Sequence, residues 1–295
     1  MPERTVCAAI VGLANVGKST LVNALVGERI AITSAKPQTT RSRMLGVLTR
    51  GEVQFMFLDT PGFHNPKTKL GEHMIKAVRE SVTDVDCAVF MTWPKAEFNE
   101  DELRLLAELK ASRAKTILCI NKTDTLKKAE DGPVFTAALG EQFAFDKTVL
   151  VSALNGDGLD ELLDDIAAFA VEGPHLYDDD ALTDVPERVI AAELIRESLL
   201  ENLRDELPHG CAVSVERFSE RGDRPLIDIE AEIICEKESH KGMIIGKGGA
   251  MLKTIGVVSR EKLESFMNCK INLKLWVKVR EGWRDKEQYL KSYGL

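Results

Sequence analysis

The feature that most constrains this chain is a glycine-containing loop between an apolar run and a segment of helical composition. The loop, residues 12–19, reads GLANVGKS and follows the apolar run at residues 7–11. In that context G-x-x-x-x-G-K-[ST] predicts a phosphate-binding loop, because backbone N–H groups and the positive end of the next helix converge there. Lys18 is expected to reach the β- and γ-phosphates, and the Ser19 hydroxyl to bind Mg²⁺. The other expected nucleotide contacts in this stretch are Gly12, Asn15, Val16, Gly17 and Thr20.

Length and composition set the frame for this loop. At 295 residues the chain can form two domains, each with its own core. No run of 18 uncharged apolar residues occurs, and residues 1–4 lack the features of a signal peptide, so we expect a cytoplasmic protein. Six widely spaced cysteines without a C-x-x-C pair indicate buried, reduced thiols, and the five histidines show no ligand spacing. We therefore expect no structural metal.

The net charge of −8 is unevenly distributed along the chain. Residues 1–170 carry a net charge of −3, residues 171–235 carry −11, and residues 236–295 carry +6. The basic C-terminal part indicates a contact with nucleic acid or another anionic surface, with a solvated basic face as the alternative.

Alternation of apolar runs with helical segments predicts an α/β layer over residues 1–172, with a mostly parallel sheet and one antiparallel hairpin near an edge. The hairpin is expected at residues 44–58. Further strands are expected at residues 87–91, 116–120 and 149–151, and helices at residues 70–83, 100–111, 133–144 and 159–169.

Residues 173–186 combine glycine, proline and an acidic triplet, which indicates a linker. The order of elements beyond it, in residues 187–295, reads αββααβ and predicts a smaller α+β domain. Its expected segments are a helix after Pro186, strands at 211–218 and 226–235, a helix interrupted by glycines at 243–266, and a strand at 270–279.

Two polar stretches complete the expected phosphate site. Asp59 and Gly62 form a D-x-x-G sequence at the end of an apolar strand, where the carboxylate can hold a Mg²⁺-bound water and the Gly62 N–H can approach a γ-phosphate. Residues 37–41, PQTTR, lie in a loop from which a threonine hydroxyl can complete the Mg²⁺ shell only when the γ-phosphate is present. Thr40 is favoured for this role, and Thr39 is the alternative.

A third polar stretch is expected to select the base. Asn121, Lys122 and Asp124 follow the strand at 116–120, and the Asp124 carboxylate can accept hydrogen bonds from N1–H and the 2-amino group of guanine. Adenine would leave that buried carboxylate unpaired, at a cost of about 1–3 kcal/mol. Ser152 and Ala153 end the next strand, where the Ala153 N–H can face the guanine carbonyl oxygen.

These stretches, in this order and spacing, resemble the fold of the translation-factor class of small GTPases. The resemblance implies GTP with Mg²⁺ as substrate and in-line attack of water, with charge stabilised by Lys18 and backbone amides. Phe63 stands where many GTPases carry a glutamine that orients this water. In similar GTPases with a hydrophobic residue there, an asparagine at the position of Asn15 helps to hold K⁺. We therefore expect slow hydrolysis that K⁺ stimulates, unless Asn15 only hydrogen-bonds its own loop.

The C-terminal part carries a second recognisable turn. Ile245, Gly246, Lys247, Gly248 and Gly249 form a G-x-x-G sequence with a preceding isoleucine, between helical segments. Such a turn can clamp about four single-stranded nucleotides, and within αββααβ it resembles a type II KH domain. Candidate phosphate contacts nearby, each also readable as a solvated surface charge, are Lys237, Lys241, Lys253, Arg260 and Lys262.

A P-loop GTPase domain with QTTR at 38–41, followed by a KH domain, resembles the Era family of bacterial GTPases over nearly the whole chain, including the ending at 277–284. The resemblance implies binding of the 3′ end of 16S ribosomal RNA, action in 30S subunit assembly, RNA-stimulated hydrolysis and peripheral association with the inner membrane. We expect a monomer that alternates between GTP and GDP. The alternatives are a membrane-associated cell-cycle regulator and an RNA-binding module with a structural nucleotide.

Overall fold

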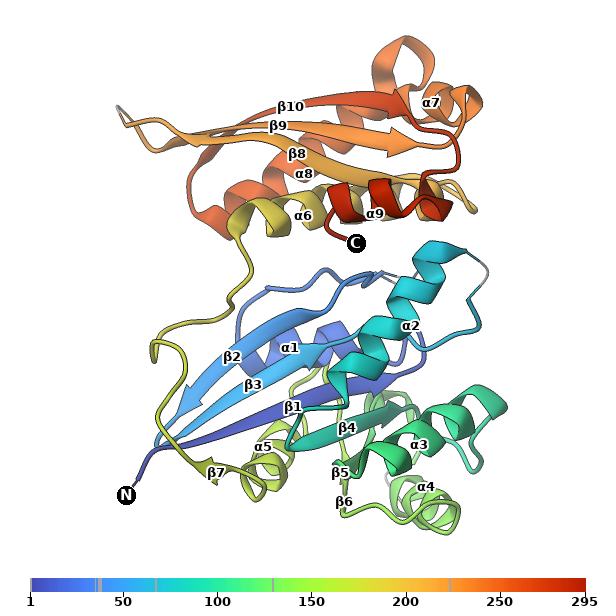
Figure 1. Cartoon of the computed structure of the whole chain (residues 1–295), viewed down its shortest axis with the longest axis vertical. Helices are drawn as coiled ribbons and strands as arrows, with labels where there is room; N and C mark the ends of the chain where they lie inside the picture. The colour runs from blue at the N-terminus through green and yellow to red at the C-terminus, as the bar shows by residue number, and fades with distance from the viewer. Residues whose placement is uncertain (1, 35, 37–38, 67, 129, 223) are drawn as a thin grey trace. The chain divides into compact units, whose positions relative to one another are not determined.

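The computed structural model describes residues 2–34, 36, 39–66, 68–128, 130–222 and 224–295 (Figure 1). Two compact units result from the folding of the chain. The first contains the residues up to 184 except for 68–70, which group with residues 185–295 in the second unit. All six cysteines are free thiols, and four of them are buried. Among the described residues, no helix has the length and apolar character needed to cross a bilayer.

The first unit is built on a seven-stranded sheet with the order β2-β3-β1-β4-β5-β6, and β7 pairs with β1. The hairpin strand β2 is antiparallel to β3, whereas β1 is parallel to β3 and β4, and the pairs β4/β5 and β5/β6 are also parallel. The predicted mostly parallel sheet with an edge hairpin is thereby confirmed. The strands are β1 (Arg4–Gly12), β2 (Met44–Arg50), β3 (Val53–Asp59), β4 (Cys87–Thr92), β5 (Lys115–Ile120), β6 (Lys147–Leu150) and β7 (Val171–Glu172).

Helices cover both faces of this sheet. Successive residues of β1 point to opposite faces, so Ile10 packs with α1 and α5 in one core, and Val11 packs with α2, α3 and α4 in the other. The helices are α1 (Lys18–Val26), α2 (Lys69–Ser81), α3 (Glu100–Ser112), α4 (Asp131–Gly140) and α5 (Leu159–Ala167). The phosphate-binding loop, the D-x-x-G segment and the base-selecting stretches follow the carboxyl ends of parallel strands, where α/β sheets bind ligands, whereas the loop that carries Thr40 lies between α1 and β2.

The stretch that the sequence indicates as a linker hydrogen-bonds along the β2–β3 hairpin as far as residue 183. The fully buried side chain of Gln54 donates to the carbonyl oxygen of Tyr177 over 2.9 Å and accepts from the Tyr177 N–H over 3.0 Å. The Val47 N–H donates to the Leu182 carbonyl oxygen over 2.8 Å. These contacts, together with β7, place residues 171–184 with the first unit.

The second unit has the predicted order αββααβ, in which the three helices contact a three-stranded sheet of order β10-β9-β8. Strands β8 and β9 are antiparallel, and β9 and β10 are parallel. The elements are α6 (Glu187–Asn202), β8 (Ala212–Glu220), β9 (Leu226–Cys235), α7 (Glu238–Ile245), α8 (Ala250–Met267), β10 (Lys270–Val279) and α9 (Glu287–Ser292).

Two details of the second unit differ from the sequence-based expectation. The helix expected at 243–266 begins earlier, at Glu238, and residues 246–249 divide it into α7 and α8, because glycines with positive φ cannot continue an α-helix. The short helix α9 has no predicted counterpart. Its leucine at position 290 is fully buried, which anchors the helix to the domain.

Candidate nucleotide site and nucleic-acid interface

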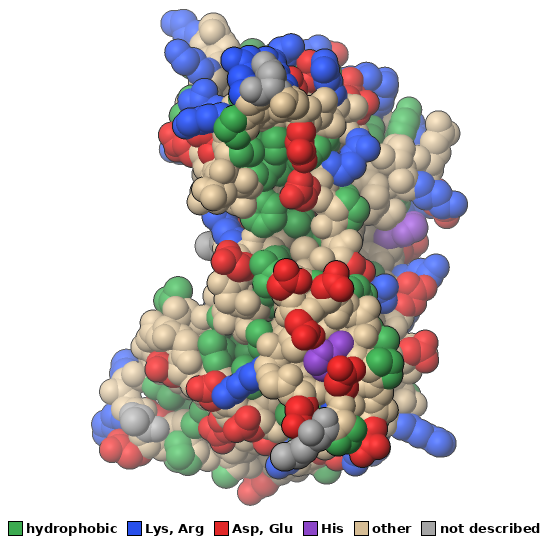
Figure 2. All heavy atoms as spheres, turned by 90° about the vertical axis from the view of Figure 1, so that its left-hand side faces the viewer, with side chains coloured by type: hydrophobic (Ala, Val, Ile, Leu, Met, Phe, Trp, Pro, Cys, Tyr) green, Lys and Arg blue, Asp and Glu red, His purple; other side chains and the backbone are tan. Residues whose placement is uncertain are grey.

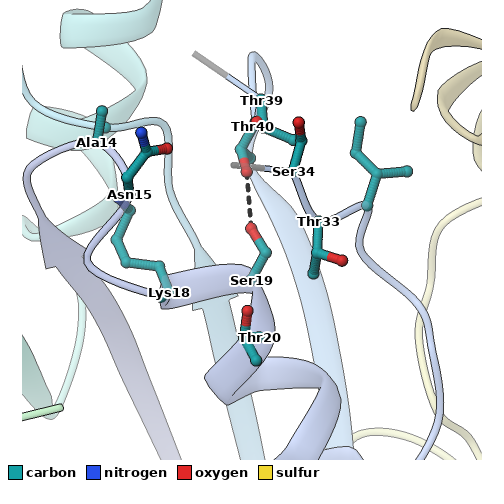
Figure 3. A pocket seen from close by; sticks show the side chains of 12 residues that line it. Ala14, Asn15, Lys18, Ser19, Thr20, Thr33, Ser34, Thr39 and Thr40 are labelled. Atoms are coloured by element: carbon teal, nitrogen blue, oxygen red, sulfur yellow. Dashed lines mark hydrogen bonds between the residues drawn. The ribbon is translucent and has the colours of Figure 1, made fainter. Parts of the chain in front are cut away.

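The phosphate-binding loop connects β1 to α1, as the sequence predicts, and lines a cavity together with residues 33, 34, 39, 40 and 62 (Figure 3). The Lys18 ammonium donates to the carbonyl oxygens of Gly12 and Leu13 over 3.2 and 2.8 Å. Burial lowers the pKa of Lys18 to about 8, and the charge of Asp59 opposes this shift. A buried cation beside two neutral carbonyl groups is a site that an anionic phosphate would stabilise.

Three oxygen-bearing side chains meet beside this cavity. The Ser19 hydroxyl donates to Asp59 Oδ2 over 2.7 Å and lies 2.8 Å from the Thr40 hydroxyl, which is itself 3.4 Å from Asp59 Oδ2. Figure 3 shows the side chains of Ser19 and Thr40 pointing toward one another from α1 and from the loop that precedes β2. Thr39 instead donates to the Lys36 carbonyl oxygen over 2.7 Å, so the structure brings Thr40, and not Thr39, to this cluster.

The oxygen cluster fits Mg²⁺. Asp59 Oδ1 is buried and has no hydrogen-bond partner among the described residues. Burial raises the pKa of Asp59 to about 6, while the hydrogen bond from Ser19 and the charge of Lys18 lower it. A cation at this carboxylate would remove the cost of the buried negative charge. Hydroxyl and carboxylate oxygens are ligands that Mg²⁺ accepts, with phosphate oxygens and waters completing its octahedral shell.

The D-x-x-G segment packs closely against the phosphate-binding loop. A Cβ added to Gly62 would lie 2.7 Å from Ala14 Cα, so no larger residue fits without a backbone shift. The Phe63 N–H donates to the Gly12 carbonyl oxygen over 3.1 Å, and the Phe63 ring is buried in the core that contains Val11. A buried phenyl ring has no group that can orient a water. Two residues of the other predicted phosphate-site stretch, Pro37 and Gln38 in the loop at residues 37–41, lie outside the described residues.

The residues expected to select the base form a connected polar network. Asn121 Nδ2 donates to the Val16 carbonyl oxygen over 2.8 Å, and its Oδ1 accepts from the Ala153 N–H over 2.9 Å. The Ala153 N–H that the sequence assigns to guanine thus contacts Asn121 in this structure. The Ser152 hydroxyl donates to Asp124 Oδ1 over 2.6 Å, which fixes the orientation of that carboxylate.

Lys122 and Asn15 also belong to this network. Lys122 Nζ donates to the Asn15 carbonyl oxygen over 2.7 Å, so the lysine stem spans the distance between the base-selecting loop and the phosphate-binding loop. Asn15 has a φ of 64°, in the left-handed region that asparagine tolerates better than most residues. The sequence analysis does not assign a role to a further asparagine, Asn23, which hydrogen-bonds to the start of the Thr40 loop. The sequence feature that could have indicated this role is its position four residues after Ser19, on the same face of the helix.

The G-x-x-G turn of the second unit joins α7 to α8. Gly246, Gly248 and Gly249 have φ values of 73°, 60° and 82°, which favour glycine at all three positions. Ile245 is half-buried and lies at the end of α7, whereas Lys247 is exposed. A tight turn without side chains at three of its four positions allows a sugar-phosphate backbone to approach closely, with Lys247 supplying charge.

The structure separates the cations around this turn into two groups. Lys262 donates to Glu197 over 2.8 Å and lies 2.6 Å from a Glu201 oxygen, so it links α8 to α6. Both partners would compete with a phosphate for this largely buried ammonium, which disfavours Lys262 as a phosphate contact. The other candidates form no ion pair in the part of the chain that the structure describes: Lys237, Lys241, Lys253 and Arg260.

Further along the chain, four cations of the basic C-terminal part are paired with carboxylates. Lys270, Lys274, Lys278 and Arg284 form ion pairs with Glu264, Glu230, Glu232 and Glu236, respectively. Fewer cations of residues 236–295 are therefore available to an anionic ligand than their net charge of +6 suggests. Figure 2 views the second unit from the end where β8 and β9 join, and shows Lys and Arg side chains gathered there and many Asp and Glu side chains over the first unit.

Comparisons with known proteins agree with both sites. The family model described as a 50S ribosome-binding GTPase matches residues 7–122, and the KH domain model matches residues 206–284. GTPase Era of Caldanaerobacter subterraneus subsp. tengcongensis is 45% identical over 294 residues, which span 100% of this chain and 98% of that protein. The chain belongs to the Era family. GTPase Era of Clostridioides difficile is 44% identical over 286 residues, covering 97% of this chain and 96% of that protein.

Solved structures of Era align with both units of this Era-family chain. A crystal structure of Era in complex with MgGDPNP and nucleotides 1506–1542 of 16S ribosomal RNA has a TM-score of 0.95 at 35% identity and covers 99% of both chains. An alanine variant of Aquifex aeolicus Era bound to GDP and AlF4⁻ has a TM-score of 0.94 at 36% identity, with the same coverage.

Proposed function

We propose that this chain is a GTP-hydrolysing switch that binds the 3′ region of 16S ribosomal RNA through its KH domain and acts in assembly of the 30S subunit. The observation that carries the proposal is the meeting of Ser19, Thr40 and Asp59 beside a buried Lys18, in a chain that also exposes a G-x-x-G turn. Era bound to MgGDPNP and to 16S ribosomal RNA, which aligns over 99% of this chain, supports both halves of it.

In the proposed reaction, the chain positions a triphosphate for in-line attack by water. Lys18 neutralises charge on the β- and γ-phosphates, and the Gly62 N–H donates to a γ-phosphate oxygen. Ser19, Thr40 and Asp59 would hold Mg²⁺, which when bound would withdraw negative charge from the phosphates. Because Thr40 lies on a loop, its contact with the cluster reports whether the γ-phosphate is present.

Guanine is the proposed base. Asp124, oriented by Ser152, accepts from the two donors on the guanine edge, while Asn121 braces the phosphate-binding loop through Val16. Lys122 lies against the base plane with its stem and holds the Asn15 carbonyl oxygen with its ammonium. The Ala153 N–H is proposed to share its donor between Asn121 and the guanine carbonyl oxygen.

Potassium is the proposed activator. The buried ring of Phe63 offers no group that orients the attacking water, so another positive charge near the phosphates is needed for an efficient reaction. Asn15 lies in the phosphate-binding loop, where its side-chain oxygen can ligate K⁺ beside the nucleotide. We expect GTP turnover to be at least several-fold faster in K⁺ than in Na⁺, and the Asn15→Ala variant to lose that difference. Equal rates in the two salts would contradict this role.

The division of labour in the chain is proposed as a GTPase domain at 1–172, a connecting segment at 173–186 and the KH domain at 187–295. We propose that the protein acts as a cytoplasmic monomer with peripheral contact to the inner membrane. Light scattering would report the mass. Pelleting with anionic vesicles at low and high salt would test the membrane contact. Absence of the protein from the vesicle pellet at both salt concentrations would contradict it.

The proposal is tested by GTP turnover in K⁺ buffer, with and without an oligonucleotide that matches the 3′ end of 16S ribosomal RNA. A scrambled oligonucleotide of the same composition is the control. Stimulation by the matching RNA alone is the expected result, since it requires both sites in one switch. Turnover that neither RNA changes would overturn the assignment of the RNA partner while leaving the GTPase intact.

A further inference from the structure

Asn23, half-buried on α1, makes three hydrogen bonds that the proposed reaction does not use. Its Oδ1 accepts from the N–H groups of Ile30 and Ala31 over 3.0 and 2.9 Å. Its Nδ2 donates to the Ala31 carbonyl oxygen over 2.8 Å. One side chain therefore bonds three backbone groups of a single dipeptide. The Ile30 N–H also donates to the Glu28 carbonyl oxygen over 3.1 Å, so the two Ala31 groups are the ones that depend most on Asn23, and losing their partner would carry a substantial cost.

This dipeptide begins the loop that ends at Thr40. Ile30 and Ala31 are each only 2% exposed, so the chain is held tightly at this point, four residues beyond the end of α1. The far side of the same loop is also fixed, because Gly46 on β2 packs so closely that an added Cβ would lie 2.9 Å from the Val26 side chain. Asn23 and the packing of β2 therefore hold the chain in place both before and after Thr40.

Helix α1 contacts both the beginning and the end of this loop. Ser19 and Asn23 are four residues apart and so lie on one face of the helix. Ser19 meets Thr40 at the end of the loop over 2.8 Å, and Asn23 holds Ala31 at its beginning. The contact of Thr40 with Ser19 thus depends on a loop whose beginning is fixed to the same helix that carries Ser19.

We propose that Asn23 is a positioning residue for GTP hydrolysis, which anchors the start of the Thr40 loop so that Thr40 reaches Ser19 and Asp59 when a triphosphate is bound. The inference rests on the proposed role of Thr40. It concerns the triphosphate state alone, because GDP has no γ-phosphate for the Thr40 loop to report. Asn23 touches neither the phosphates nor the base in this arrangement, and acts through the backbone of residues 30 and 31.

The expected signature is a selective loss. Asn23→Ala should bind Mg·GDP within about twofold of the parent, should bind Mg·GDPNP about tenfold more weakly, and should lower kcat at saturating GTP by about tenfold, because only the closed loop is affected. Asn23→Asp keeps the acceptor for both N–H groups and should lose only about threefold. Asn202→Ala, which removes another helical asparagine bonded to a backbone carbonyl, should change none of these values.

The experiment measures the affinities for Mg·GDP and Mg·GDPNP, the kcat and the melting temperature for these variants and for Thr40→Ala, all in the full chain. A selective loss of Mg·GDPNP affinity in both Asn23→Ala and Thr40→Ala supports the inference. Equal loss for both nucleotides in Asn23→Ala, or no loss for either, overturns it while Thr40→Ala remains selective. A Thr40→Ala variant that binds both nucleotides normally would instead overturn the role proposed for Thr40. A fall in melting temperature without a change in the GDP-to-GDPNP affinity ratio would assign Asn23 a structural role and overturn the inference.

Discussion

The nucleotide site and the RNA-binding surface place their charges in opposite environments. In the nucleotide site Lys18 and Asp59 are buried. Lys18 donates a hydrogen bond to the Leu13 carbonyl oxygen, and Asp59 accepts one from Ser19. Around the G-x-x-G turn, Lys247 and Lys253 are exposed and form no ion pair in the part of the chain that the structure describes. A buried network fixes geometry before the ligand arrives, whereas exposed lysines supply attraction that salt screens. Single changes should therefore have large effects at the first site and small, additive effects at the second.

The largest effect is expected for Asn121→Ala. This change removes the partners of the Val16 carbonyl oxygen and the Ala153 N–H, and each unsatisfied group costs about 1–3 kcal/mol. Affinity for GDP and for GTP should fall by about 100-fold or more. Isothermal titration calorimetry would measure it, with thermal melting of the nucleotide-free protein as the check on folding. A loss below threefold would show that the network is less cooperative than its buried geometry indicates.

Gly62→Ala should produce a smaller effect that is confined to hydrolysis. The new Cβ would lie 2.7 Å from Ala14 Cα, and both groups belong to backbone segments that cannot rotate away. The Gly62 N–H should then move from the γ-phosphate, and loss of one such donor lowers kcat by about 100-fold. Binding of GDP should change by less than about threefold. Single-turnover kinetics would separate the effect on hydrolysis from the effect on binding. A variant that hydrolyses GTP at the parent's rate would show that the added methyl group does not displace the Gly62 N–H from the γ-phosphate.

The sequence predicts the parts of both sites that are contiguous in the chain. The phosphate-binding loop, the D-x-x-G segment, the base-selecting stretch and the G-x-x-G turn each carry their chemistry within a few residues. The contacts that hold these parts together have no local signature, because their partners are far apart in sequence. Gln54 and Tyr177 are separated by 123 residues, and Lys262 and Glu197 by 65. Only the fold shows that Lys262 belongs to a structural ion pair and that the expected linker lies along the β2–β3 hairpin.

Lys262 and Lys253 sharpen the comparison, because they lie on one helix in different environments. Lys262→Met would remove the ammonium that pairs with the fully buried Glu197 and should reduce the free energy of unfolding by about 3 kcal/mol. Lys253→Met should leave stability unchanged. Urea unfolding of the full chain, followed by tryptophan fluorescence, would measure both. Equal stability of the two variants would show that Lys262 is no more important for folding than Lys253.

The same two variants should behave in the opposite way toward RNA. Lys253→Met should weaken binding of the matching oligonucleotide by a few-fold and reduce the slope of log K against log salt by about 0.7, as expected for one lost phosphate contact on a single strand. Lys262→Met should leave that slope unchanged. Fluorescence anisotropy at several salt concentrations would measure the slopes, and an altered slope for Lys262→Met would restore it as an RNA contact.

The smallest effect on stability is expected at His175, which belongs to the segment along the β2–β3 hairpin. Its environment is intermediate between the buried nucleotide site and the exposed lysines of the KH domain. Its Nδ1 lies 2.7 Å from Asp179 and its Nε2 lies 3.3 Å from the Glu52 carbonyl oxygen. Both partners only accept, so the doubly protonated ring satisfies both. The hydrogen bond to Asp179, followed by that to Glu52, raises the pKa of His175 above its usual 6.5.

A raised pKa fixes the sign of the pH dependence. The folded chain binds this proton more tightly than the unfolded chain, so the stabilisation is complete below pH 6.5 and is lost as pH rises through the raised value. NMR titration of His175 should show the raised pKa in the parent, a return toward 6.5 in Asp179→Asn, and no change in the neighbouring Asp180→Asn. A titration that Asp179→Asn leaves in place would mean that solvent screens this pair as it screens the exposed lysines of the KH domain, and that Gln54 and the other contacts along the hairpin hold the segment without it.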